Sequence, residues 1–336
     1  INYLLGVTLF TNLRICNWTD RNDKIDEIIR RINKKEKVIT PFPIISMIDN
    51  PQIQRNNAEI YAKKFPKNFV LNKSQTFNNN EKIKIGYFSP DFRSHPIAYS
   101  VSELFEIHNR DNFEIHAFYH GVETKDEEYF RIKEAVDEFH NISLLDDEQA
   151  ALMSKSLNID IAVDLCCYTG RHRTNIFAMS AAPIQVTFLY AGTMGTNYYD
   201  YIIADKTLIP ETHKKYYCED ILYLPSWQAN ESKKPVSPKK MTKKDFGIPD
   251  DKFIFCSFNN PYKISPEAFD LWSKILDQVQ KSVLVLISDN QTVIKNLKNE
   301  IKLRGINPER LIFVKNMKSP EHLSRFKLMD LSLDTF

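Results

Sequence analysis

Hydrophobic residues fall into a repeating pattern of short and long segments from about residue 82 to the end of the chain. Short apolar runs rich in β-branched and aromatic residues predict strands, and longer stretches with apolar residues three or four positions apart predict helices. The predicted strands cover 83–88, 113–119, 139–143, 159–165, 184–189, 201–204, 253–258, 282–287, 311–314 and 331–333, and the predicted helices include 97–107, 266–279, 292–303 and 320–328. Strands that alternate with helices favour parallel sheets in an α/β fold.

Polar stretches divide this pattern into parts. Residues 1 to about 66 are predicted to be helical, because Ile25, Ile28, Ile29 and Ile32 form a helical stripe and Pro51 opens a second amphipathic segment. We therefore expect two Rossmann-like domains behind a short helical region. The expected ranges are a helical leader and linker at 1–80, the first Rossmann-like domain at 81–230, a linker at 231–245, and an incomplete second Rossmann-like domain at 246–336.

Composition excludes several kinds of protein. With 45 Lys and Arg against 43 Asp and Glu, the net charge of +2 predicts no nucleic-acid partner, and no apolar run reaches membrane-spanning length. The five cysteines are odd in number and lack C-x-x-C spacing, so we expect no zinc site but reduced thiols in a cytoplasmic protein. Cys166 and Cys167, at a predicted strand end, are expected to be semi-buried.

The two Rossmann-like domains open in the same way. Strand 83–88 leads through Ser89–His95 into a helix that begins at Pro96. Strand 253–258 leads through Asn259–Ser265 into a helix that begins at Pro266, with Ser265 as its expected N-cap. Such sheets bind ligands beyond the carboxyl ends of their strands, where helix N-termini attract anions. His95, the expected N-cap, and Lys263 are therefore candidates for binding a phosphorylated ligand. On position alone, a histidine before proline such as His95 is more often a turn residue, and a lone loop lysine such as Lys263 is more often a solvated charge.

Four segments resemble motifs of the O-GlcNAc transferase and SPINDLY type of glycosyltransferase. Ile85–Pro96 resembles the first motif of the catalytic region, and Ala182–Val186 with Gly192–Gly195 resembles the second. Phe255–Glu267 is similar to the segment that carries the family's catalytic lysine. Asn17–Asp20 resembles the segment that joins the family's tetratricopeptide repeats to its catalytic region. The resemblance covers nearly the whole chain.

The resemblance implies a GT-B fold and an inverting reaction that needs no cofactor and no metal. The expected activity is transfer of GlcNAc from the nucleotide-sugar donor UDP-GlcNAc to Ser or Thr hydroxyls of a protein acceptor. Lys263 matches the family lysine that stabilises the leaving diphosphate, and the neighbouring Asn260 is a candidate donor-binding residue. His95 matches a histidine near the reacting sugar, with a positioning or proton-handling role. Independently, the sequence contains no D-x-D pair, the usual metal–diphosphate ligand of another glycosyltransferase architecture.

Further candidates match loops on the acceptor side of the family's site: Tyr168, Thr169, Arg173, Gly192 and Thr193. Two departures from the family pattern lie in these loops. The turn at 190–193 is one residue shorter than usual, and Cys166-Cys167 stands where glycine is usual before Tyr-Thr. Both changes leave the choice of acceptor open.

Two other readings stay open. A relative of the same class would transfer fucose from GDP-fucose, and a chain of another class would be a non-catalytic protein-interaction module. Lys263 and His95 favour an enzyme, since a scaffold needs neither. The resemblance also implies upstream tetratricopeptide repeats and, after Phe336, a loop that binds the donor diphosphate. We therefore expect this chain alone to fold in its first Rossmann-like domain but to be inactive.

Overall fold

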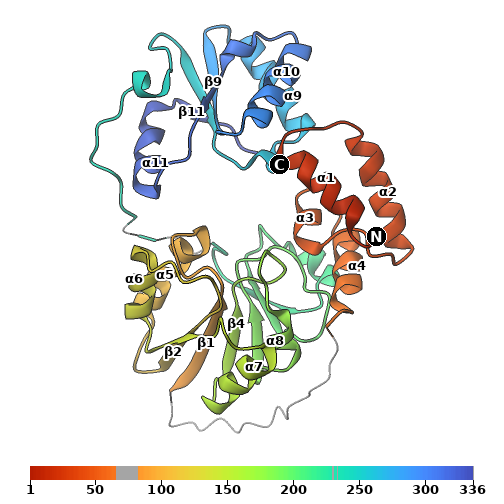
Figure 1. Cartoon of the computed structure of the whole chain (residues 1–336), viewed down its shortest axis with the longest axis vertical. Helices are drawn as coiled ribbons and strands as arrows, with labels where there is room; N and C mark the ends of the chain where they lie inside the picture. The colour runs from red at the N-terminus through yellow and green to blue at the C-terminus, as the bar shows by residue number, and fades with distance from the viewer. Residues whose placement is uncertain (66–81, 229–230, 233, 336) are drawn as a thin grey trace. The chain divides into compact units, whose positions relative to one another are not determined.

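The computed structural model describes residues 1–65, 82–228, 231–232 and 234–335, so most of the expected linker before residue 81 lies outside the described residues. Two compact units make up the chain (Figure 1). The seven-stranded unit comprises Ile29–Ser232 together with Asn2, and the four-stranded unit combines Tyr3–Ile28 with Lys233–Phe336 and Ile1. Each unit contains one parallel sheet, as the alternation of strands and helices predicted.

The sheet of the seven-stranded unit has the strand order β3-β2-β1-β4-β5-β6-β7, and every neighbouring pair is parallel. Its strands are β1 (Ile83–Ser89), β2 (Phe113–Tyr119), β3 (Glu138–Asn141), β4 (Ile161–Asp164), β5 (Ile184–Thr187), β6 (Tyr201–Ala204) and β7 (Asp220–Tyr223). Its helices are α3 (Pro41–Ile45), α4 (Pro51–Ala62), α5 (Pro96–Ile107), α6 (Glu127–Ala135), α7 (Asp147–Ser156) and α8 (Thr174–Ala178). The order in which successive strands are added to the sheet changes side between β1 and β4, and parallel sheets bind ligands at such a switch point.

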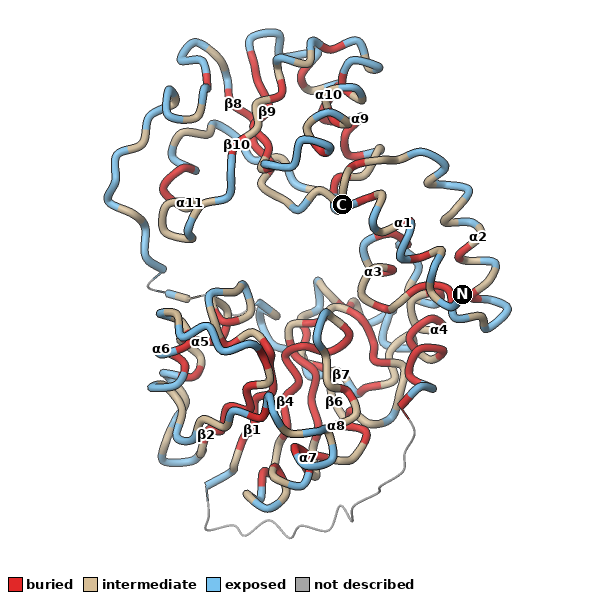
Figure 2. Tube along the Cα trace, in the orientation of Figure 1, coloured by how far each residue is buried: buried red, intermediate tan, exposed pale blue. Residues whose placement is uncertain are grey.

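Burial concentrates on the strands and on the inner faces of the helices (Figure 2). In the seven-stranded unit, α5 contributes Val101 and Phe105 to a core that also contains Ile115 of β2 and Ile132 of α6. Gly86 in β1 lies on the opposite face, where an added Cβ would come within 2.9 Å of the Phe118 ring. The central strands are therefore packed on both faces, as expected for a parallel sheet.

The sheet of the four-stranded unit has the strand order β10-β9-β8-β11, again fully parallel. Its strands are β8 (Phe253–Ser257), β9 (Ser282–Ile287), β10 (Leu311–Val314) and β11 (Leu331–Ser332), and its helices are α1 (Leu4–Arg14), α9 (Pro266–Gln278), α10 (Gln291–Leu303) and α11 (Ser319–Arg325). Ser265 caps α9 by accepting a hydrogen bond from the N–H of Ala268 at 3.1 Å. The expected cap at Ser265 and the expected helix start at Pro266 are both confirmed.

The helical leader does not form a unit of its own. Cys16 is buried in the core of the four-stranded unit, and the Trp18 ring meets the Phe269 ring edge-on at 5.5 Å. By contrast, α4 packs against the seven-stranded unit through Tyr61, whose ring meets Tyr168 at 4.9 Å. The helix α2 (Arg21–Asn33) runs across the boundary between the units. The leader expected at 1–80 is therefore shared, because its two ends bury apolar side chains in different cores.

Most predicted elements agree with the structure, and the misses are short. Strands 113–119, 201–204, 282–287 and 311–314 have the predicted bounds, whereas β7 was not predicted. Four residues of alternating exposure give too little pattern to identify β7 from sequence. None of the helices in the described part of the chain is long and apolar enough to cross a membrane.

Candidate active site

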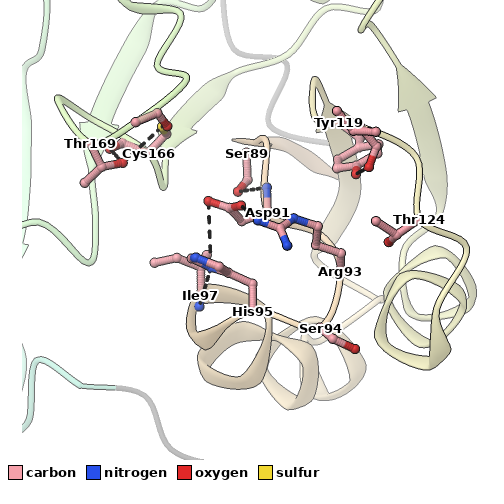
Figure 3. Close-up of polar contacts among 12 residues, drawn as sticks. Ser89, Asp91, Arg93, Ser94, His95, Ile97, Tyr119, Thr124, Cys166 and Thr169 are labelled. Carbon is pink, nitrogen blue, oxygen red and sulfur yellow. Dashed lines mark hydrogen bonds and ion pairs between the residues drawn. The ribbon is translucent and has the colours of Figure 1, made fainter. Parts of the chain in front are cut away.

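The segment between β1 and α5 forms a compact polar loop at the carboxyl edge of the seven-stranded sheet (Figure 3). The N–H of Asp91 donates to Oγ of Ser89 at 3.0 Å, and Nη2 of Arg93 donates to Oδ1 of Asp91 at 2.9 Å. His95 has an extended backbone, and its Nδ1 accepts a hydrogen bond from the N–H of Ile97 at 3.3 Å. The prediction that His95 caps this helix is confirmed.

His95 is partly buried and has a lowered pKa. Burial lowers the pKa most, the Asp91 carboxylate raises it, and the Arg93 guanidinium lowers it again. Oδ2 of Asp91 lies 3.7 Å from Nδ1 of His95. Because Nδ1 accepts from Ile97 in this arrangement, a neutral ring carries its proton on Nε2, which can donate to an oxygen of a ligand.

Sequence reasoning missed a second histidine beside this loop. His120 follows β2, and its main-chain N–H donates to the carbonyl of Ser89 at 3.1 Å. Its Nδ1 is buried and has no partner among the described residues, and burial is the main cause that lowers its pKa to about 3. The next residue, Gly121, passes so close to Pro90 that an added Cβ would lie 2.0 Å from that carbonyl oxygen. No signal in the sequence marks His120, since it follows an ordinary strand.

The loop after β4 is organised by the buried carboxylate of Asp164. Oδ1 accepts from the N–H groups of Cys166 at 2.9 Å and Cys167 at 2.8 Å, while Oδ2 accepts from the hydroxyl of Tyr199 at 2.7 Å. Cys167 has a φ of 48°, in the left-handed region that favours glycine. This backbone geometry explains why glycine suits that position. Both thiols are buried, so the expectation of semi-buried cysteines was wrong for this pair.

The candidate residues in and after this loop use their polar side-chain atoms in hydrogen bonds within the protein. The Tyr168 hydroxyl donates to the carbonyl of Met194 at 2.8 Å, and the ring is buried. The Thr169 hydroxyl donates at 2.6 Å to a main-chain carbonyl of its own turn. Arg173 binds the 142–147 loop through one carboxylate at 2.6 Å and two main-chain carbonyls. These side chains shape the loop: Tyr168 is buried, and Thr169 and Arg173 are half-buried.

The turn after β5 is held from inside. Thr193 is buried, and its hydroxyl donates to Glu219 at 2.7 Å, while the same carboxylate accepts from the N–H of Met194 at 2.7 Å. Gly192 is buried against Ile45, where an added Cβ would come within 2.8 Å of that side chain. Gly192 and Thr193 therefore set the path of the turn and present no free side chain.

The corresponding loop of the four-stranded unit follows β8. Asn260 and Lys263 lie at the two ends of a short 3₁₀ turn, where the N–H of Lys263 donates to the carbonyl of Asn260 at 2.9 Å. Both residues are exposed, and the Lys263 ammonium has no hydrogen bond or ion pair with the described residues. Asn259 donates to Asp334 at 2.9 Å, which ties this loop to the segment after β11. The turn leaves an uncompensated cation beyond the carboxyl end of β8.

A buried arginine near the same sheet edge was also missed. Arg325 at the end of α11 is fully buried, stacks on the Phe258 ring at 4.4 Å, and donates to the carbonyl of Lys315 at 2.9 Å. A second contact joins its guanidinium to Nδ1 of His322. Its Nε and the nearby strand-end Ser257 Oγ are buried without partners in the described residues. The sequence gives no signal for this burial, because Arg325 lies in an ordinary amphipathic helix.

The sequence therefore singled out two groups of residues that the structure assigns to different units. His95 and the 166–169 loop share the carboxyl edge of one sheet, and the Asp91 carboxylate contributes, after burial and Asp164, to the raised pKa of Cys166. Asn260 and Lys263 lie at the edge of the other sheet. Within residues 1–65, 82–228 and 234–335, no three His, Cys, Asp or Glu side chains are grouped to bind a metal.

Two parallel α/β units, each with a polar loop after its first strand, are the elements of a two-Rossmann fold. The family model described as Glycosyl transferase family 41 matches residues 15–229 and 227–336. The chain therefore belongs to this family, which confirms the resemblance drawn from the sequence motifs.

Individual relatives agree with this assignment. The chain is 30% identical over 347 residues to a protein of Arabidopsis thaliana named "Probable UDP-N-acetylglucosamine--peptide N-acetylglucosaminyltransferase SEC", covering 96% of this chain and 35% of that protein. It is 27% identical to a Petunia hybrida protein with the same activity name and the designation SPINDLY, over 76% of this chain and 28% of that protein. The chain thus spans about a third of the length of these relatives.

A solved structure confirms the fold class. A lysine-to-methionine mutant of Thermobaculum terrenum O-GlcNAc transferase superposes with a TM-score of 0.81 at 23% identity, covering 99% of this chain and 64% of that one. At this identity the likeness concerns the fold. The expected α/β architecture of the GT-B type is confirmed.

Proposed function

We propose that the protein is an inverting glycosyltransferase that moves GlcNAc from UDP-GlcNAc to Ser or Thr hydroxyls of proteins without a metal ion. The observation that carries the proposal is the uncompensated Lys263 ammonium beyond the carboxyl end of β8, in a chain of Glycosyl transferase family 41. A cation in this place can meet the negative charge that builds on a departing diphosphate.

The four-stranded unit has the features of a donor-binding unit. Lys263 supplies an exposed positive charge, and the exposed amide of Asn260 can donate to a phosphate or sugar oxygen. Arg325 and Ser257 keep buried polar atoms without partners at the same sheet edge. Buried polar groups normally have partners, so orphaned donors at a sheet edge support a ligand there.

The seven-stranded unit offers the acceptor-facing chemistry. Its loop after β1 presents a neutral imidazole, and its loop after β4 is fixed by Asp164. An acceptor hydroxyl must lose a proton as its oxygen bonds to the sugar, and a positioned histidine can take part in that transfer. The proposal assigns this role to His95.

Transfer by the full-length protein tests the proposal. Incubation with UDP-[¹⁴C]GlcNAc and a lysate of proteins should label Ser or Thr residues, and GDP-[¹⁴C]fucose should give no label under the same conditions. Label from GDP-fucose alone would assign the other donor. No label from either donor, with a folded protein, would support a non-catalytic module.

We expect this transfer to survive chelation of divalent cations. If Lys263 and main-chain N–H groups meet the charge on the diphosphate, 10 mM EDTA, roughly a thousandfold above trace metal, should change the rate by less than about twofold. The rate is measured with and without EDTA after extensive dialysis. Loss of activity in EDTA that Mn²⁺ restores would contradict the metal-free reaction.

We expect His95→Ala to lower activity while the protein stays folded. The substitution removes the cap on the N–H of Ile97, and the loss of an N-cap costs about 1 kcal/mol, or roughly 2–4 °C in Tm for a unit of this size. The loss of proton handling should cost about 10²-fold in kcat. Thermal melting followed by circular dichroism and initial rates separate the two effects. A fully active variant, or an unfolded one, would make His95 a structural residue.

A further inference from the structure

Nδ1 of His95 has two neighbours that make opposite demands on it. The N–H of Ile97, at 3.3 Å, requires a lone pair on Nδ1, whereas Oδ2 of Asp91, at 3.7 Å, requires a proton there. One ring nitrogen cannot meet both demands at once. Both distances exceed the roughly 3.0 Å of a good hydrogen bond, so neither contact locks the ring.

Whether Nδ1 carries the proton of the neutral ring determines whether Nε2 is a hydrogen-bond donor or has a free lone pair. When Nδ1 accepts from Ile97, the neutral ring carries its proton on Nε2, which can then only donate. When Nδ1 carries the proton and donates to Asp91, Nε2 has a free lone pair and can take a proton from a substrate. The two tautomers therefore correspond to two chemical roles of the same side chain.

The contacts of Asp91 leave one of its carboxylate oxygens facing Nδ1 of His95. Its N–H donates to Ser89 Oγ at 3.0 Å, and Arg93 occupies Oδ1 at 2.9 Å, which leaves Oδ2 toward the imidazole (Figure 3). The Asp91 side chain is 13% exposed, so water screens its charge only in part. A hydrogen bond to a carboxylate is stronger than one between neutral groups. Arg93 shares the charge of Asp91 and so moderates its pull on His95.

We propose that Asp91 is a positioning residue that draws the proton of neutral His95 onto Nδ1 and so frees Nε2 to act as the general base. This inference rests on the proposed function. The acceptor oxygen forms its bond to C1 of the sugar, the bond from C1 to the diphosphate oxygen breaks, and the diphosphate leaves with that electron pair. The hydroxyl proton passes to Nε2, and the resulting imidazolium keeps its Nδ1–H on Oδ2 of Asp91.

The tautomer of His95 can be measured without any transfer activity. Histidine is labelled with ¹⁵N in the 336-residue chain, and long-range ¹H–¹⁵N spectra at pH 7.5 report which ring nitrogen carries the proton. The wild type should contain both tautomers of His95. Asp91→Asn should reduce the Nδ1–H tautomer at least about fivefold, since an amide can instead donate to Nδ1, and Arg93→Met should increase it.

Asp126→Asn is the matched control. This carboxylate also binds the same loop, because it accepts from the N–H of Ser94 at 2.9 Å, but its hydrogen bonds are with Ser94, Thr124 and Tyr129 and not with the His95 ring. An unchanged tautomer ratio in Asp91→Asn would overturn the proposal. An equal shift in Asp126→Asn would overturn it too, because loop distortion would then explain the result.

Kinetics of the full-length protein give a second readout. Asp91→Asn should lower kcat about 10–10²-fold and leave the KM for UDP-GlcNAc within about twofold, since the base acts only in the transition state. A normal kcat would overturn the proposal. A shifted tautomer in a protein that transfers no sugar even as wild type would instead overturn the proposed function and leave the Asp91–His95 relation standing.

Discussion

Replacing Lys263 by methionine is expected to lower kcat of the full-length protein by about 10²–10³-fold and to leave its melting curve unchanged. The ammonium makes no hydrogen bond or ion pair with the residues that the structure describes, so its removal costs the fold almost nothing. Methionine keeps the length and apolar stem of lysine but cannot meet the charge of a leaving diphosphate. Initial rates at saturating UDP-GlcNAc and a thermal melt measure the two quantities separately.

Lys274→Met provides the comparison. Lys274 is an exposed lysine on α9 of the same unit, so the substitution removes the same charge from the same domain away from the β8 loop. We expect its kcat to stay within about twofold of the wild type, because a surface charge remote from the site is screened by salt. Equal losses in the two variants would mean that net charge matters and that Lys263 has no special role.

Asp164→Ala is expected to destabilise the seven-stranded unit by about 3–5 kcal/mol. The substitution leaves two main-chain N–H groups, of Cys166 and Cys167, and the Tyr199 hydroxyl buried without an acceptor. Each such group costs about 1–3 kcal/mol, and Cys167 would have to keep its left-handed backbone without support. Urea unfolding of the 336-residue chain, followed by far-ultraviolet circular dichroism, gives the change in the free energy of unfolding.

Asp164→Asn separates the hydrogen bonds from the charge. The asparagine Oδ1 can still accept from Cys166 and Cys167, and its amide can donate to the Tyr199 oxygen once that hydroxyl turns. We expect a loss of only about 1 kcal/mol, because burial already disfavours the ionised form and raises the pKa of Asp164. A loss as large as that of Asp164→Ala would show that the carboxylate charge itself holds the loop.

The features that sequence predicted well are local ones. His95 and Ser265 were identified as helix caps because the signal, a polar residue before Pro at the start of an amphipathic stretch, lies within a few positions. The parallel sheets followed from the strand and helix periodicity. The family motifs then directed attention to Lys263, whose exposure and free charge fit a binding role.

What sequence could not predict depends on residues far apart in the chain. Thr193 was expected in the site, but its hydroxyl belongs to a buried network with Glu219, 26 positions away. From sequence, Arg325 is expected on the surface of a helix, but in the structure its guanidinium contacts Phe258 and His322. The Nδ1 of His120 is buried without a partner among the described residues, although His120 simply follows a strand in the sequence. Propensity and periodicity carry no information on such contacts.

The division of the helical leader between the two units has a consequence for folding during synthesis on the ribosome. Tyr3–Ile28 is synthesised well before Lys233–Phe336, yet Cys16 and Trp18 belong to a core that also needs Leu311. At about 5–20 residues per second, this apolar segment waits roughly 15–60 s for its partner, while the seven-stranded unit folds in between. During that interval the nascent chain exposes the hydrophobic side chains of this segment, and we expect chaperones to bind it for a time set by this delay.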